Sequence, residues 1–81
     1  MDKEYLNKRD KLKEEFQKKL GRHIVSLREK QGLSQAELAR KCEKDRQSLE
    51  RIENGKTNPT AFYLSEIANA LGISLKDLFD F

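Results

Sequence analysis

A cluster of long polar side chains stands in the middle of the chain: Arg46, Gln47, Glu50 and Arg51. An arginine can donate two hydrogen bonds to O6 and N7 of guanine, a glutamine can pair doubly with adenine, and a glutamate can accept from N4 of cytosine. Arginine and glutamine are also good helix formers on any solvated surface, which for an isolated helix is the commoner explanation. The four side chains can recognise base edges only if the surrounding elements expose them on one side of a helix.

Two short helices are expected to position these side chains. Ser34, followed by Glu37 three residues later, forms a capping box that predicts a helix as far as about position 42. Asp45 is the expected cap of the next helix, over residues 45–54, which carries the polar cluster. Only residues 43–44 remain for a tight turn between the two. A helix, a tight turn and a second helix with long polar side chains outside is the arrangement that enters the major groove of DNA.

Upstream of this pair, apolar residues recur at helical spacing as far as Gly32, a residue that can take the left-handed conformation that closes a helix. Gly21 interrupts the stretch, at a cost of about 1 kcal/mol relative to alanine. We therefore expect the helix proper to begin near Phe16, after a charged extension over residues 1–15, with the folded domain over residues 16–81. The apolar stripe consists of Leu12, Phe16, Leu20, Ile24 and Leu27, spaced 4, 4, 4 and 3 residues apart.

Two further helices are predicted after the loop Lys56–Pro59. Thr60 caps a fourth helix that ends at Gly72, and Ser74 caps a short fifth helix that runs to about Asp80. The chain shows no alternating strand pattern, internal repeat or low-complexity tract. Five short helices with short loops predict an all-α, compact five-helix domain behind a charged N-terminal extension.

Composition excludes several kinds of site. Cys42 is the single cysteine and His23 the single histidine, so we expect no internal disulfide and no metal site. We expect no cofactor and no enzymatic activity, because no nucleophile–base pair, phosphate-binding glycine loop or carboxylate cluster is visible. The absence of a long apolar run predicts a cytoplasmic protein without a membrane span. The net charge of +3, basic upstream of Pro59 and acidic downstream, is a weak indication of nucleic-acid binding.

Several motifs occur together at fixed spacing. L-S-Q-A-E-L-A begins at Leu33, R-Q-S-L-E-R-I-E-N-G-K begins at Arg46 and is followed after one residue by N-P, and I-A-N-A-L-G-I-S begins at Ile67. Together they resemble the lambdoid phage repressor family (Cro/C1-type, XRE) of helix-turn-helix proteins, over residues 16–79. The resemblance implies a lambda-repressor-like fold and sequence-specific binding of double-stranded DNA, with helix 45–54 inserted into the major groove.

The resemblance also implies roles for single residues. Arg28 and Glu53 match a structural ion pair that ties the first helix to the third; such a pair orients more than it stabilises, because desolvation offsets much of its attraction. Base contacts are implied for Arg46, Gln47 and Arg51, with Glu50 as a further candidate, and phosphate contacts for Gln35, Ser48, Asn54, Lys56, Thr57 and Asn58.

The chain departs from the family at two places near the recognition helix. Glu43 and Lys44 occupy the turn where relatives often have a glycine and an apolar residue, so either a non-glycine residue holds a strained backbone there or the turn differs. Glu50 stands where many relatives have a small polar residue. It can accept from cytosine, pair with Arg46 four residues before it, or repel phosphate, and the pair with Arg46 is the favoured explanation.

Two copies are expected to act together, because one recognition helix covers few base pairs and family members pair on half-sites about one helical turn apart. The acidic C-terminal segment is too apolar for a free tail, and the basic side would face DNA phosphates. Aromatic residues also replace polar or small ones early in the fourth helix, which indicates extra core or a partner surface. The expected homodimer interface consists of Phe62, Tyr63, Leu78, Phe79 and Phe81.

The expected function is that of a transcriptional regulator, in the first place a dimeric repressor that binds a DNA operator. A controller protein of a restriction-modification system is one form of this hypothesis. The alternative is an antitoxin or adaptor whose main task is to bind a partner protein. Residues 1–15 could serve such a partner, although a solubilising tail is the commoner explanation for a charged segment. The polar set Arg46, Gln47 and Arg51 argues against an adaptor.

Overall fold

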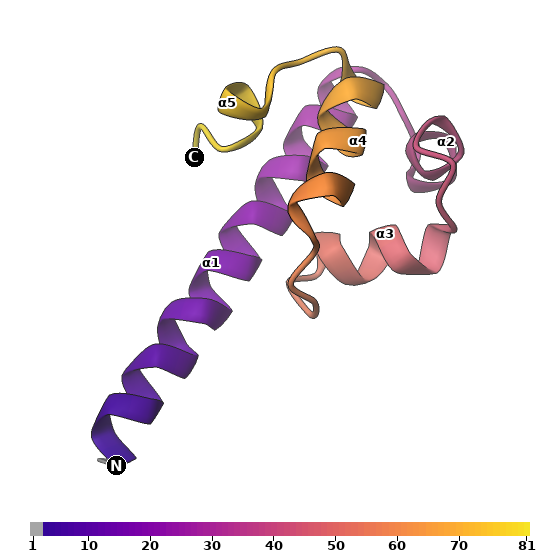
Figure 1. Ribbon diagram of the computed structural model, residues 1–81. Coiled ribbons are helices and arrows are strands. Elements are labelled where there is room, and N and C mark those ends of the chain that lie inside the picture. The colour runs from indigo at the N-terminus through magenta and orange to yellow at the C-terminus, as the bar shows by residue number, and fades with distance from the viewer. Residues whose placement is uncertain (1–2) are drawn as a thin grey trace.

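The computed structural model describes the backbone of residues 3–81 and the side chains from Asn7 onward. Over this part of the chain the fold is all-helical, as the sequence predicts, and α2 to α5 gather around the C-terminal half of a long α1 (Figure 1). None of these helices combines the length and the apolar composition that a membrane span needs. The helices are α1 (Lys3–Lys30), α2 (Gln35–Lys41), α3 (Arg46–Glu53), α4 (Ala61–Leu71) and α5 (Leu75–Leu78).

The short helices α2 to α5 begin where the sequence predicts. In each, the side chain of the capping residue accepts a hydrogen bond from a backbone N–H three residues later, which satisfies one of the free amides of the first turn. Ser34 also completes the predicted capping box, because its own N–H donates to the Glu37 carboxylate at 3.0 Å. The caps are Ser34, Asp45, Thr60 and Ser74.

The first helix begins earlier than the sequence indicated. α1 is continuous from Lys3 to Lys30, so the prediction that the helix starts near Phe16 is wrong. Residues 7–20 consist mostly of lysine, arginine, glutamate, glutamine and leucine, which lose little side-chain freedom in a helix. The charged segment predicted over residues 1–15 is therefore helical from Lys3 on, where it forms the first part of α1.

The hydrophobic core lies between the C-terminal half of α1 and the four shorter helices. Leu78 is fully buried, so its assignment to a dimer interface is wrong: α5 is a single turn, and this side chain fastens it to the core. Cys42 is buried as expected of a structural thiol, and this burial raises its pKa. The buried apolar residues are Leu20, Ile24, Leu38, Ala39, Cys42, Leu49, Ile52, Leu64, Ile67, Ala68, Leu71 and Leu78.

The apolar stripe predicted along α1 reaches the core only towards its C-terminal end. Leu20 and Ile24 are buried, but Leu12 is 68% and Phe16 46% exposed. The reason is the spacing, because each step of four residues advances about 40° around a helix that turns about 100° per residue. Successive steps back from Ile24 rotate the stripe away from the core. Gln17, three residues before Leu20, takes the buried position instead.

Gly21 lies where α1 crosses the end of α3. A Cβ atom at this position would lie 2.6 Å from the carbonyl oxygen of Ile52 and closer still to that of Glu53. Both oxygens belong to the backbone, which cannot swing aside as a flexible side chain can. The glycine costs helix propensity, but it is what allows α1 and α3 to pack this closely.

Gly21→Ala is expected to destabilise the domain by about 1–3 kcal/mol, because overpacking against two carbonyl oxygens outweighs the better helix propensity of alanine. Ser26→Ala, at an exposed position of the same helix, is the matched control and should raise the stability slightly. Urea unfolding followed by circular dichroism measures both changes. A more stable Gly21→Ala variant would contradict the close crossing of α1 and α3.

Candidate nucleic-acid interface

The outer side of α3 is polar because its apolar residues are used in the core. Leu49 and Ile52 are buried between the helices, whereas Arg46, Gln47 and Arg51 are exposed. The cap of α3 holds its first turn firmly, since the Asp45 carboxylate accepts from the backbone N–H three residues later at 2.7 Å. The structure thus exposes three of the candidate base-contacting side chains on a short, well-capped helix.

A shallow hollow of 340 Å³ lies along α3 and the loop that follows it. Its rim combines hydrogen-bond donors and acceptors, with the cations Arg51 and Lys56 against the single carboxylate of Glu50. Among the described side chains, no group of three or more His, Cys, Asp or Glu residues gathers that could hold a metal ion. Five of the residues predicted from the sequence line the hollow together: Gln47, Glu50, Arg51, Asn54 and Lys56.

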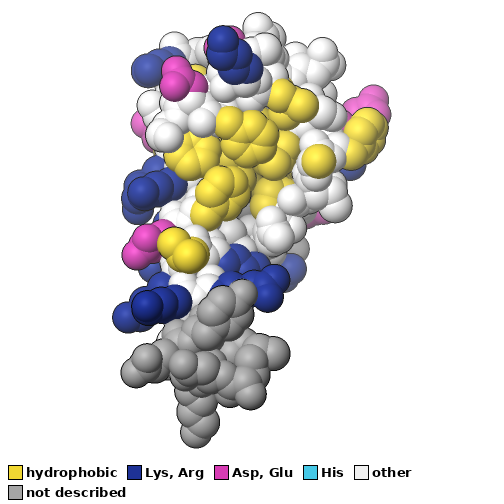
Figure 2. Space-filling view, turned by 60° about the vertical axis from the view of Figure 1, so that its left-hand side comes forward, with side chains coloured by type: hydrophobic (Ala, Val, Ile, Leu, Met, Phe, Trp, Pro, Cys, Tyr) yellow, Lys and Arg dark blue, Asp and Glu magenta, His cyan; other side chains and the backbone are white. Residues whose placement is uncertain are grey.

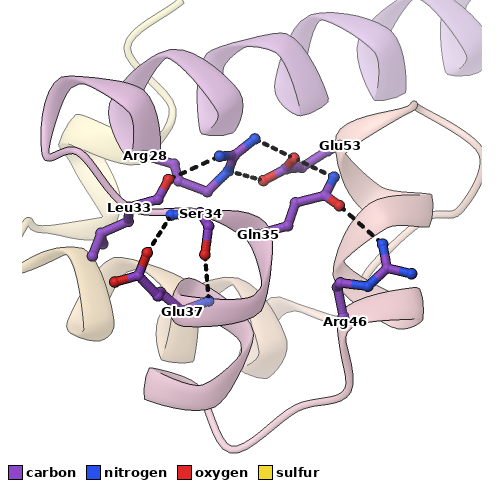
Figure 3. A network of polar contacts seen from close by, with 7 residues as sticks. All are labelled: Arg28, Leu33, Ser34, Gln35, Glu37, Arg46 and Glu53. Carbon is purple, nitrogen blue, oxygen red and sulfur yellow. Dashed lines mark hydrogen bonds and ion pairs between the residues drawn. The ribbon is translucent and has the colours of Figure 1, made fainter.

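Arg46 is held in place at the N-terminal end of α3. Its Nη1 lies 3.2 Å from Oε2 of Glu50 and 3.4 Å from Oε1 of Gln35. Gln35 in turn donates from Nε2 to Oε1 of Glu53 at 2.8 Å, so its side chain stands between Arg46 and Glu53 (Figure 3). The favoured pair of Arg46 with Glu50 is therefore present, and Gln35 links the start of α2 to both ends of α3.

Arg28 and Glu53 form a two-pronged ion pair between α1 and α3, as expected. Nε and Nη2 of Arg28 donate to the two carboxylate oxygens at 2.8 and 3.0 Å, and Nη1 donates to the Leu33 carbonyl at 2.9 Å (Figure 3). The hydrogen bond to Glu53 raises the pKa of Arg28, against the opposing effect of burial. The Glu53 side chain is 1% exposed and accepts from both α1 and α2, so it joins three helices.

The turn between α2 and α3 has the strain that its sequence indicated. Glu43 adopts a φ of 57°, and among the described residues it alone has a positive φ without being a glycine. Lys44 pairs with Glu66 at 3.0 Å and lies over the Tyr63 ring, 5.1 Å from its centroid. The turn therefore combines a backbone penalty with side-chain contacts to α4.

Tyr63 also ties α4 to α3, because its hydroxyl lies 2.9 Å from Oγ of Ser48. Tyr63 packs against the edge of the core, whereas Phe62 beside it is 72% exposed. Ser48 does not line the hollow along α3, and neither do Thr57 and Asn58 in the loop. Their contacts with phosphate stay predictions.

Three residues of α1 adjoin this surface and were not predicted from the sequence. Gln17 donates from Nε2 to the Gly55 carbonyl at 3.1 Å and so steadies the loop after α3. Lys18 and Arg22 are cations one turn apart, a signal that the sequence does contain, but only the crossing of α1 with α3 places them beside the loop. A second hollow of 260 Å³ is lined by Lys18, Arg22, Glu53 and Asn54.

A helix, a tight strained turn and a second helix with an exposed polar side define a helix-turn-helix domain. The chain belongs to the helix-turn-helix family (HTH_3), whose model matches residues 24–78. This family consists of DNA-binding transcriptional regulators, and the match covers α2 to α5 completely. The part of α1 that precedes Ile24 lies outside the match.

Individual relatives agree with this assignment. The chain is 36% identical over 64 residues to the HTH-type transcriptional regulator y4dJ of Sinorhizobium fredii, covering 79% of this chain and 83% of the relative. It is 40% identical over 62 residues to the control protein C.MunI of a Mycoplasma species, covering 75% and 84%. Among solved structures, the restriction-modification controller protein C.AhdI from Aeromonas hydrophila has a TM-score of 0.76 at 33% identity, covering 78% of this chain and 91% of that one.

Glu43→Gly is expected to raise the free energy of unfolding by up to about 1 kcal/mol, because glycine adopts a positive φ without the penalty of a side chain. The gain is limited by the greater freedom of glycine in the unfolded chain. The midpoint of urea unfolding measures it. Lys41→Gly, at an exposed position in the last turn of α2, should instead lower the stability; equal losses at both positions would contradict the strain at Glu43.

Arg28→Ala is expected to destabilise the domain by about 3–5 kcal/mol, because it leaves the Glu53 carboxylate buried without its charged partner. Replacing both partners, as Arg28→Met with Glu53→Leu, should recover most of this loss, because no charge then remains buried. Chemical unfolding of the two variants measures the difference. A double variant as unstable as Arg28→Ala would show that the ion pair itself supplies the stability.

Proposed function

We propose that the chain is a sequence-specific transcriptional regulator that inserts α3 into the major groove of double-stranded DNA, acting as a dimeric repressor in the cytoplasm. The observation that carries this proposal is the hollow along α3, where exposed donors and acceptors gather beside two cations. Long side chains of this kind suit base edges, and the cations suit the phosphates beside them.

Base recognition falls to the exposed side of α3. Gln47 and Arg51 are one turn apart and line the same hollow, so both can reach into one groove. The ion pair with Glu50 orients the Arg46 side chain through Nη1. The other guanidinium nitrogens of Arg46 can then donate to a guanine. The same carboxylate would disfavour a phosphate nearby and can accept from cytosine, which supports its assignment to base contacts.

Phosphate contacts are assigned to residues on either side of α3. Gln35 lies at the start of α2, and Asn54 and Lys56 lie at the exit of α3, so the two groups would hold the backbone on both sides of the groove. Lys18 and Arg22 extend this row onto α1, because their hollow shares Asn54 with the one along α3. Ser48, Thr57 and Asn58 remain further candidates.

The proposal includes two further points: the protein binds DNA as a dimer, and it represses transcription. A dimer would place two copies of α3 on half-sites, and its presence on an operator would block transcription. The resemblance to lambdoid repressors supports repression, and the names of the relatives C.MunI and C.AhdI favour a controller protein over an antitoxin. Of the interface residues expected from the sequence, Phe79 and Phe81 are exposed and are kept as candidates; Tyr63 is half-buried against α3, and Phe62 is exposed on α4, away from the C-terminal segment.

Two variants test the division between base and phosphate contacts on a duplex that the protein selects from a random library. Arg51→Ala is expected to cost about 1–3 kcal/mol on the selected duplex and to relax the preference at one base pair. Lys56→Ala is expected to weaken binding to all duplexes and to lower the slope of log K against log salt by about 1. Fluorescence anisotropy at several salt concentrations measures both.

Lys76→Ala in α5 is the matched control and should leave DNA binding unchanged, since it removes a positive charge outside both hollows. Selection of no duplex, or equal affinities of the parent, Arg51→Ala and Lys56→Ala, would contradict the proposed function and favour a protein-binding adaptor.

A further inference from the structure

The N-terminal half of α1 carries apolar side chains that the described part of the chain does not cover. In Figure 1 this half extends away from α2 to α5. Leu12 and Phe16 are exposed there because the helix rotates them off the core. The family match begins only at Ile24, so Leu12 and Phe16 lie outside it.

The C-terminus brings two more aromatic side chains to the same place. The Phe16 and Phe81 rings lie 5.9 Å apart, and Phe81 lies 6.5 Å from Phe79, measured between ring centroids. Apolar side chains gather on this face in Figure 2, and a hollow of 540 Å³ opens between them. Such a gathering of large apolar groups marks an interaction site. The α1–C-terminal patch consists of Leu12, Phe16, Phe79 and Phe81, exposed by 68%, 46%, 42% and 46%.

We propose that the α1–C-terminal patch is covered by a second copy of this chain, which packs its own α1 antiparallel across it. The proposal rests on the proposed function in one respect, that two copies act together, and it names the surface by which they pair. The surface differs from the one expected from the sequence, because it adds Leu12 and Phe16 of α1 and omits Phe62 and Tyr63 of α4.

The charges at the rim of the patch favour a second copy over another partner. Glu15 and Lys19 both line the hollow and lie one turn apart on α1. A two-fold axis that passes between them would place Glu15 of one copy opposite Lys19 of the other, and the same contact would form again on the other side of the axis. A rim with one charge of each sign is complementary to itself, whereas it selects neither a strongly acidic nor a strongly basic partner.

The shape of the surface fits the same register of the two α1 helices, in which Glu15 of one copy lies opposite Lys19 of the other. Antiparallel helices that pair Glu15 with Lys19 also bring Leu12 of one copy opposite position 22 of the other. A hollow of 360 Å³ lies there, beside the first one, and Phe81 lines both. Leu12 is the most exposed member of the patch and would enter this hollow. The residues that line this second hollow are Lys19, Arg22, His23 and Phe81.

The C-terminal side of the patch is fixed to α1 in the single chain. His23 Nε2 lies 3.1 Å from the Asp77 carbonyl oxygen, and the imidazole ring of His23 lies 5.4 Å from the Phe81 ring. The surface is therefore formed before pairing, which lowers the entropic cost of association. The patch shares no residue with the hollow along α3, whereas Arg22 of the cation row beside it also lines the hollow that Leu12 of the second copy would enter.

Sedimentation velocity of the full chain at micromolar concentrations tests the proposal, with circular dichroism to confirm that each variant is folded. The parent is expected to dimerise, and Leu12→Glu to raise the dimer dissociation constant roughly ten-fold or more, because it buries a charge in the interface. Phe62→Glu is the matched control: it is an equally exposed apolar residue outside the patch, and it should leave the dimer unchanged.

Charge exchange at the rim identifies the occupant as a second copy. Glu15→Lys alone should weaken the dimer, because two lysines would then face each other at both contacts. Adding Lys19→Glu should restore it, because opposite charges face each other again. Failure of the double exchange to restore dimerisation would overturn the proposed register.

Three results overturn the proposal: a parent that stays monomeric with and without DNA, a dimer that Phe62→Glu disrupts while Leu12→Glu does not, and an assembly that forms only with a different protein. The function is tested separately. A monomer that still binds one half-site in an Arg51-dependent way leaves the DNA-binding function intact. A dimer that Leu12→Glu disrupts, but that binds no duplex, supports the patch and refutes the function.

Discussion

The buried carboxylate of Glu53 is the interaction on which the rest of this structure depends. It accepts two hydrogen bonds from Arg28 of α1 and one from Gln35 of α2, while it belongs to the last turn of α3. A buried charge is costly unless its partners are all in place. Arrangements of the three helices that separate these partners are therefore disfavoured. The direction in which α3 presents Arg46 and Arg51 follows from this constraint rather than from the short turn before α3.

The crossing of α1 with α3 gives one helix two different surfaces. Gly21 allows the backbones to approach, and on one side of this contact Lys18 and Arg22 extend the basic surface at the end of α3. On another side of α1, Leu12 and Phe16 meet the C-terminal aromatic residues. Side chains four residues apart drift around the circumference of a helix, so one helix of this length presents the cations assigned to DNA and the apolar residues of the proposed dimer surface on different sides.

The turn between α2 and α3 shows how a local penalty is offset by a neighbouring element. Glu43 holds a positive φ that glycine would adopt more easily. The contacts of Lys44 and Ser48 with Tyr63, and of Lys44 with Glu66, attach both sides of the turn to α4. Lys44 and Tyr63 are thus connected, since the aromatic ring and the Glu66 carboxylate of α4 provide contacts for the lysine in the turn.

The sequence by itself determined the helices and the beginnings of the four shorter ones, because a cap such as Ser34 or Asp45 acts on a backbone amide three residues away. The ion pair of Arg28 with Glu53 could be predicted only through the resemblance to a known family. Tertiary structure decided the exposure of the first apolar residues of α1, the burial of Leu78, and the place of Lys18 and Arg22 beside α3. These depend on the rotation and crossing of whole helices, which is set by contacts between residues far apart in the chain and leaves no local signal.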